Sequence, residues 1–143
     1  METLRKTMHE AVRGRHPGRR ILIADDDPIA LEGLRSLLES WGYVVGTATD
    51  GRAALDQLPI VHPALVITDL VMPRMTGLEL LESIRRNPPI IPVIIMTAHG
   101  TLENRRRAVA SGAAAYLSKP VDIGHLKFLL ESVLRDTRGD GQP

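Results

Sequence analysis

The stretch "ILIADDDP", residues 21–28, decides how this chain folds. Its apolar beginning is typical of a parallel strand that is covered on both faces. Three consecutive aspartates follow, although neighbouring carboxylates repel each other by about 1 kcal/mol at 4 Å in water and by more in a drier site. On an open surface such acids would serve solubility alone. Because they stand where a buried strand is expected to end, we interpret them as part of a functional site.

The same stretch also predicts the start of a helix, with Asp27 as the N-cap and Pro28 as the first helical residue. Short apolar runs and amphipathic stretches then alternate to the end of the chain. The expected strands are residues 21–24, 43–48, 64–68, 93–96 and 114–117. The expected helices are residues 28–41, 51–58 (closed by Pro59), 77–86 (opened by a capping box of Thr76 and Glu79), 101–111 and 123 to about 136.

Five strands that alternate with five helices predict an α/β fold of the (βα)5 type, a doubly wound parallel sheet with helices on both faces. In such sheets, ligands bind beyond the carboxyl ends of the strands, at the point where the strand order reverses. The residues expected at that edge are Asp25, Asp26, Asp69, Thr97 and Lys119.

These residue types together favour phosphoryl chemistry. Carboxylates that converge at one edge need positive charge among them, and Lys119 supplies one such charge. Mg²⁺ would supply two more, since it prefers oxygen ligands and often takes one or two carboxylates together with a phosphate. Asp69 is then left as a nucleophile that would form an acyl phosphate, with Thr97 as a hydroxyl donor and Lys119 as an anion clamp.

Four stretches in this order resemble the receiver domain of two-component response regulators: the "DD" of "ILIADDDP", "ITDLVMPRMTGLELL", "VIIMTAHG" and "AAAYLSKPVD". The resemblance covers about residues 20–137. It implies a flavodoxin-like sheet of strand order 2-1-3-4-5. It also implies that Asp69 is the phosphoacceptor and that Mg²⁺ is held by Asp26 directly, by Asp25 largely through water, by Asp69, and by the backbone carbonyl of Val71.

Three further residues take their expected roles from the same resemblance. Thr97 would hydrogen-bond the phosphoryl group, and Lys119 would pair with Asp69 and then with the phosphoryl oxygens. Tyr116 stands at the aromatic switch position of the family, although a half-buried packing role is the plainer alternative. The Lys119-Pro120 peptide bond is expected to be cis.

The implied function is a phosphorylation-activated switch that catalyses only its own phosphorylation and dephosphorylation. The expected partners are a sensor histidine kinase or histidine phosphotransfer protein and a downstream effector. The surface formed by residues 101–136 would regulate that effector, with homodimerisation through it as a possibility. Arg105, Arg106 and Arg107 on this surface are either a solvated helix face or a docking face.

Three alternatives are weaker. A Mg²⁺-dependent phosphatase of the haloacid dehalogenase type would need a second aspartate where Val71 stands. A phosphorylation-independent interaction scaffold would not need the intact set of acids, threonine and lysine. A nucleotide-binding module would need a glycine-rich loop after the first strand, which is absent from the sequence.

Composition sets the remaining expectations. The 143 residues and 43% hydrophobic content suit one domain, and the lack of cysteine suits the cytoplasm. No apolar run is long enough for a membrane span, and the net charge of +1 gives no reason to expect direct nucleic-acid binding. We expect a flexible basic arm over residues 1–19, the receiver over 20–137 and a tail over 138–143. So short a tail favours a stand-alone receiver over a piece of a longer regulator.

Overall fold

The computed structural model describes residues 18–140, with side chains up to residue 135. The expected arm of residues 1–19 lies outside the described residues except for Gly18 and Arg19. Residues 141–143 of the expected tail also lie outside them.

One five-stranded parallel sheet of order β2-β1-β3-β4-β5 forms the centre of the fold. This confirms the predicted doubly wound sheet and its strand order. In chain order the elements are β1 (Arg20–Ala24), α2 (Pro28–Ser40), β2 (Val44–Ala48), α3 (Gly51–Val61), β3 (Leu65–Thr68), α4 (Gly77–Arg86), β4 (Val93–Thr97), α5 (Leu102–Ala110), β5 (Ala115–Ser118) and α6 (Ile123–Asp140).

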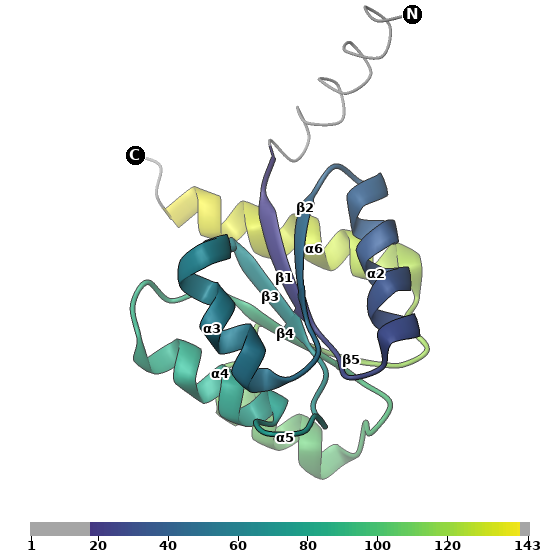
Figure 1. Cartoon of the computed structure of the whole chain (residues 1–143), viewed down its shortest axis with the longest axis vertical. Coiled ribbons are helices and arrows are strands. Elements are labelled where there is room, and N and C mark those ends of the chain that lie inside the picture. The colour runs from purple at the N-terminus through teal and green to yellow at the C-terminus, as the bar shows by residue number, and fades with distance from the viewer. Residues whose placement is uncertain (1–17, 141–143) are drawn as a thin grey trace, which may run out of the picture.

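Helices cover both faces of the sheet, with α2 and α6 on one face and α3, α4 and α5 on the other (Figure 1). Side chains alternate along β1, so Ile21 and Ile23 contact the α2–α6 layer while Leu22 and Ala24 contact the opposite layer. All four are at most 2% exposed. Since burying one such aliphatic side chain is worth about 1.5–3 kcal/mol, the continuous apolar run is explained by having a hydrophobic core on each side.

Two predicted helix starts are confirmed. The Asp27 carboxylate accepts hydrogen bonds from the backbone N–H groups of Ile29 (3.0 Å) and Ala30 (3.4 Å) and thereby caps α2. At α4, the Thr76 hydroxyl accepts from the N–H of Glu79 and the Glu79 carboxylate accepts from the N–H of Thr76. Both caps satisfy N–H groups that a helix start leaves unpaired.

Several predicted boundaries were wrong, most of them by one residue, as at both ends of α5 and of β5. Pro59 does not close α3, which continues to Val61. The proline removes one backbone donor, but Leu58 and Val61 on either side of it pack against the core, and this burial favours another turn. His62, in the left-handed conformation (φ 50°), then ends the helix. The last helix extends to Asp140 and not to about residue 136, and β2 begins at Val44, one residue late.

Strand register brings the expected site residues to one edge of the sheet. Ala24 pairs with Thr68, and the Asp69 N–H donates to the Ala24 carbonyl at 2.9 Å, so Asp25 and Asp69 leave neighbouring strands at the same level. On the other side, Thr97 pairs with Ser118, and Lys119 follows directly. The Lys119-Pro120 bond is cis, as predicted. Within residues 18–140, no helix is both long and apolar enough to cross a membrane.

Candidate functional site at the carboxyl edge of the sheet

Three carboxylates gather where β1 and β3 end. One oxygen from each of Asp25, Asp26 and Asp69 lies within 4.8 Å of the others. Asp25 and Asp69 are buried, at 8% and 9% exposure, whereas Asp26 is exposed. An all-oxygen set of this kind suits a hard cation such as Mg²⁺, which keeps several waters on its open side. The exposed position of Asp26 leaves that side accessible.

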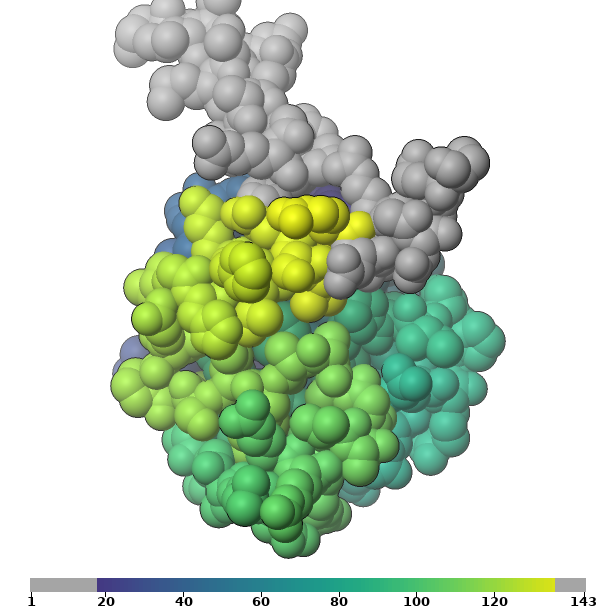
Figure 2. All heavy atoms as spheres, turned by 180° about the vertical axis from the view of Figure 1, so that it is seen from behind, coloured from purple at the N-terminus to yellow at the C-terminus, as the bar shows by residue number. Residues whose placement is uncertain are grey.

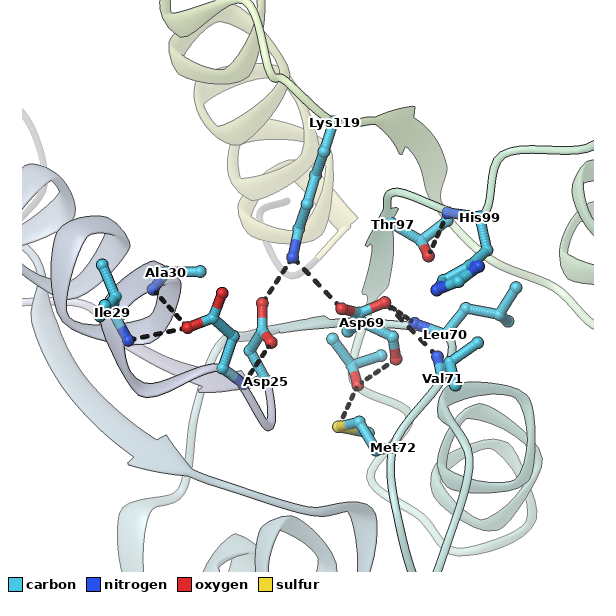
Figure 3. Close-up of polar contacts among 12 residues, drawn as sticks. Asp25, Ile29, Ala30, Asp69, Leu70, Val71, Met72, Thr97, His99 and Lys119 are labelled. Atoms are coloured by element: carbon cyan, nitrogen blue, oxygen red, sulfur yellow. Dashed lines mark hydrogen bonds and ion pairs between the residues drawn. The ribbon is translucent and has the colours of Figure 1, made fainter.

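Lys119 supplies the positive charge within this cluster (Figure 3). Its ammonium Nζ lies 2.6 Å from Asp25 Oδ2 and 3.2 Å from Asp69 Oδ2, and so bridges the ends of β1 and β3. Burial lowers the pKa of Lys119, but the hydrogen bond to Asp25 and the negative charges of Asp69 and Asp25 together outweigh it. The pKa is therefore raised above its ordinary value, and the lysine stays charged.

The Asp69 carboxylate is held in one orientation. Its Oδ1 accepts from the N–H of Leu70 at 2.6 Å and from that of Val71 at 3.4 Å, while Oδ2 faces Lys119 (Figure 3). The loop after Asp69 is fixed in turn by Gly77, whose N–H donates to the Leu70 carbonyl at 2.8 Å. A side chain at Gly77 would overlap the backbone carbonyl oxygen of Asp69, so close backbone approach requires glycine there.

Thr97 lies fully buried at the end of β4, and its hydroxyl oxygen accepts from the N–H of His99 at 3.0 Å. Tyr116 on β5 is half-buried, and its hydroxyl donates to the His99 carbonyl at 3.4 Å. Partial burial raises the pKa of Tyr116 above its ordinary value, with the charge of Arg105 opposing and that of Asp69 adding to the shift. Both predicted residues therefore meet the same loop residue, His99.

Asp27 does not belong to the acid cluster, because its carboxylate caps α2. Its backbone N–H nevertheless donates to Asp25 Oδ1 at 2.9 Å. Asp25 thus has one oxygen on this N–H and the other on Lys119.

Sequence reasoning placed the strand-end residues together but missed three contacts. It placed the charge of Lys119 among the carboxylates but named Asp69 as its partner, whereas Asp25 lies closer to the ammonium. It gave no role to Gly77, although a glycine directly after a capping threonine was a usable signal. It also gave none to Asn104, whose side chain donates to the His99 carbonyl at 2.8 Å. No spacing rule marks a polar residue in the first turns of a helix as a loop contact.

The chain is similar to known signalling proteins. A family profile described as the response regulator receiver domain matches residues 21–131. The transcriptional regulatory protein ZraR of Escherichia coli is 41% identical over 117 residues, which is 82% of this chain but 26% of that protein. The response regulator MprA of Mycolicibacterium vanbaalenii is 37% identical over 121 residues, 85% of this chain and 52% of that one. This chain therefore spans between a quarter and about half of these relatives.

A solved structure gives the same fold. The CheY-like response regulator receiver domain protein from Methanospirillum hungatei superposes with a TM-score of 0.81 at 32% identity, covering 86% of this chain and 98% of that chain.

Gly77→Ala should destabilise the protein by about 1–3 kcal/mol or more, because the new methyl group would have to displace the Asp69 backbone. Gly33→Ala is the matched control. Gly33 lies within α2, nothing would lie within 4 Å of its added methyl group, and alanine should stabilise the helix by about 0.5–1 kcal/mol. Urea unfolding of the two variants and the wild type measures both effects. Equal stability of the two variants would contradict the proposed close approach.

Proposed function

The chain belongs to the family of response regulator receiver domains, and we propose that Asp69 is the residue at which this switch accepts its phosphoryl group. The family's members are phosphorylation-activated switches of two-component systems. The observation that carries the assignment to Asp69 is its place at the end of β3, oriented by backbone N–H groups and facing both the acid pair and Lys119. A partner histidine kinase or phosphotransfer protein would be the donor.

In the proposed reaction, a carboxylate oxygen of Asp69 attacks the phosphorus of a phosphohistidine. The new O–P bond forms as the N–P bond breaks, and the donor imidazole leaves with the electron pair. The backbone N–H groups of Leu70 and Val71 hold the Asp69 carboxylate in a fixed orientation. This lowers the entropy cost of the attack. The Nζ of Lys119 already lies 3.2 Å from Asp69 Oδ2. After transfer it would pair with the negatively charged phosphoryl oxygens.

The acid cluster fits Mg²⁺. Asp25, Asp26 and Asp69 carry three formal negative charges against the one of Lys119, so a divalent cation would balance the site. We propose Asp26 and Asp69 as direct ligands, Asp25 as a ligand largely through water, and the Val71 carbonyl as a further ligand. When bound, Mg²⁺ neutralises charge that spreads over the phosphoryl oxygens during transfer.

Thr97 and Tyr116 would change their contacts when Asp69 is phosphorylated. The Thr97 hydroxyl now accepts from His99 N–H but would turn to donate to the phosphoryl group. Tyr116, whose hydroxyl donates to the carbonyl of the same residue, His99, would then change its packing. The surface expected to respond is made of α5, β5 and α6, and we propose that it binds the effector or a second copy of the chain. We also propose a cytoplasmic location, which the lack of cysteine fits.

The two main alternatives make different demands on the site. A haloacid dehalogenase-type phosphatase would need an acid or base at Val71, whose side chain has none. An interaction scaffold that never accepts phosphate would need neither the oriented carboxylate nor the lysine bridge. The second alternative is therefore separated from the proposal by a phosphorylation experiment.

Asp69→Asn should abolish phosphorylation, since an amide is a far poorer nucleophile than a carboxylate. The wild type and the variant are incubated with Mg²⁺ and acetyl phosphate, and the intact mass of each is measured. The wild type should gain one phosphoryl group and the variant none. Equal labelling of both would refute the assignment, and no labelling of either would favour the scaffold.

Mg²⁺ affinity should depend on Asp26 and not on Asp27. Asp26→Ala removes a direct ligand and should weaken binding at least about tenfold, since even outer-shell partners are worth that much. Asp27→Ala removes the α2 cap and should cost about 0.5–2 kcal/mol of stability while leaving affinity within about twofold of the wild type. Calorimetric Mg²⁺ titration and urea unfolding give the two readings. The reverse pattern would mean that the ligands are assigned one residue out of register.

The acyl phosphate should be long-lived, because Val71 borders the expected path of the hydrolytic water. Val71 is 50% exposed, and its side chain has no hydrogen-bonding group with which to orient water. Val71→Asn should therefore shorten the lifetime several-fold, and His99→Ala should change it less. Decay of the phosphorylated protein at saturating Mg²⁺ is followed by mass. An unchanged lifetime in Val71→Asn, with a several-fold longer one in His99→Ala, would assign control of the water to the histidine.

A further inference from the structure

Helix α5 is held to the rest of the domain by little buried surface. Of its nine residues, Ala108 alone is buried, whereas five of the ten residues of α4 are. Leu102 and Val109 on α5 are more than half exposed. In Figure 2, the segment around α5 is green and lies at the lower end of the visible face, and α6 lies above it in yellow. The position of α5 therefore depends strongly on polar contacts at its N-terminal end.

Beside the Thr101 cap, three hydrogen bonds near that end meet at a single atom, the backbone carbonyl oxygen of His99. It receives the N–H of Thr101 at 3.0 Å, the side-chain amide of Asn104 at 2.8 Å and the hydroxyl of Tyr116 at 3.4 Å. A carbonyl oxygen has two lone pairs, so three donors compete for it. The Asn104 bond is the shortest of the three.

Asn104 stands in the first two turns of α5, where it is half-buried among exposed neighbours. Its backbone N–H is used by the Thr101 cap at 3.1 Å, which leaves the side chain for the loop. The other end of the same loop residue, the His99 N–H, donates to the Thr97 hydroxyl. One peptide segment thus joins Thr97 on β4 to Asn104 on α5.

We propose that Asn104 is a positioning residue that holds α5 in the unphosphorylated arrangement through the His99 carbonyl. The proposal rests on the proposed function, because it requires Thr97 to turn from His99 N–H to a phosphoryl group on Asp69. That turn removes one anchor of the His99 residue and frees it to move. The Asn104 contact opposes this movement and therefore favours the unphosphorylated state. It keeps α5 in its present position until Asp69 carries the phosphoryl group.

Loss of this contact should shift the population towards the phosphorylated-like state. A hydrogen bond that exists in one state only biases the equilibrium by about two- to tenfold. Asn104→Ala deletes the donor, and Asn104→Asp replaces the amide by a carboxylate that cannot donate to a carbonyl. Both keep the Thr101 cap, because that cap uses the backbone N–H. Arg106→Ala, at an exposed position of the same helix, is the matched control.

The test uses the whole chain, with Mg²⁺ and beryllofluoride as the phosphoryl mimic, followed by amide NMR. For each α5 amide, the wild-type signal has one position without beryllofluoride and another at saturation. In both Asn104 variants without the mimic, the signal should lie on the line between these two positions, displaced towards the saturated one. Beryllofluoride affinity should rise about two- to tenfold, and Arg106→Ala should change neither reading. A structural role alone would lower the stability without moving the signals along that line.

The effect should persist in a Tyr116→Phe background, because Asn104 contacts the carbonyl independently of the tyrosine. Signals that stay at the free position, or an effect that vanishes without the tyrosine hydroxyl, would overturn the role of Asn104 while leaving the proposed function intact. A wild type that does not respond to beryllofluoride, just as Asp69→Asn would not, would overturn the proposed function and this inference with it.

Discussion

The Lys119 ammonium between Asp25 and Asp69 is the interaction on which the site depends. Parallel strands end at one edge, and the β1–β3 register places two buried carboxylates there side by side. Without a cation between them, their repulsion would oppose the same register that the aliphatic core favours. The lysine arrives from β5, beyond β4, so its reach across the edge links the strand ends into one electrostatic unit.

Within the described residues, a densely buried part of the domain lies beside a sparsely buried one. Strands β1, β3 and β4 are buried along nearly their whole length, and they carry the acids and Thr97. The helix that would pass the signal on, α5, is held largely by polar contacts to one loop. A signalling domain needs both properties, because chemistry requires fixed groups whereas a switch requires an element with two positions of similar free energy.

Much of the fold and site followed from the sequence, because the signals were local. Apolar runs located the strands, and caps such as Asp27 and Thr76 located helix starts. The expected strand-end residues did come together at one edge, namely Asp25, Asp26, Asp69, Thr97 and Lys119. Pro59 misled because its local preference lost to the packing of Val61. The charge of Lys119 among the carboxylates was predicted, but the closer approach of Asp25 was not, because it depends on register and rotamer.

The sparse burial of α5 has an evolutionary consequence. Because eight of its nine side chains avoid the core, most of its sequence is free to vary without cost to folding or to the reacting groups. Paralogous signalling proteins in one cell must avoid binding each other's partners, and a face that tolerates substitution is where such insulation accumulates most readily. A duplicated gene of this kind could acquire a new partner by drift on one helix while the phosphorylation chemistry stayed unchanged.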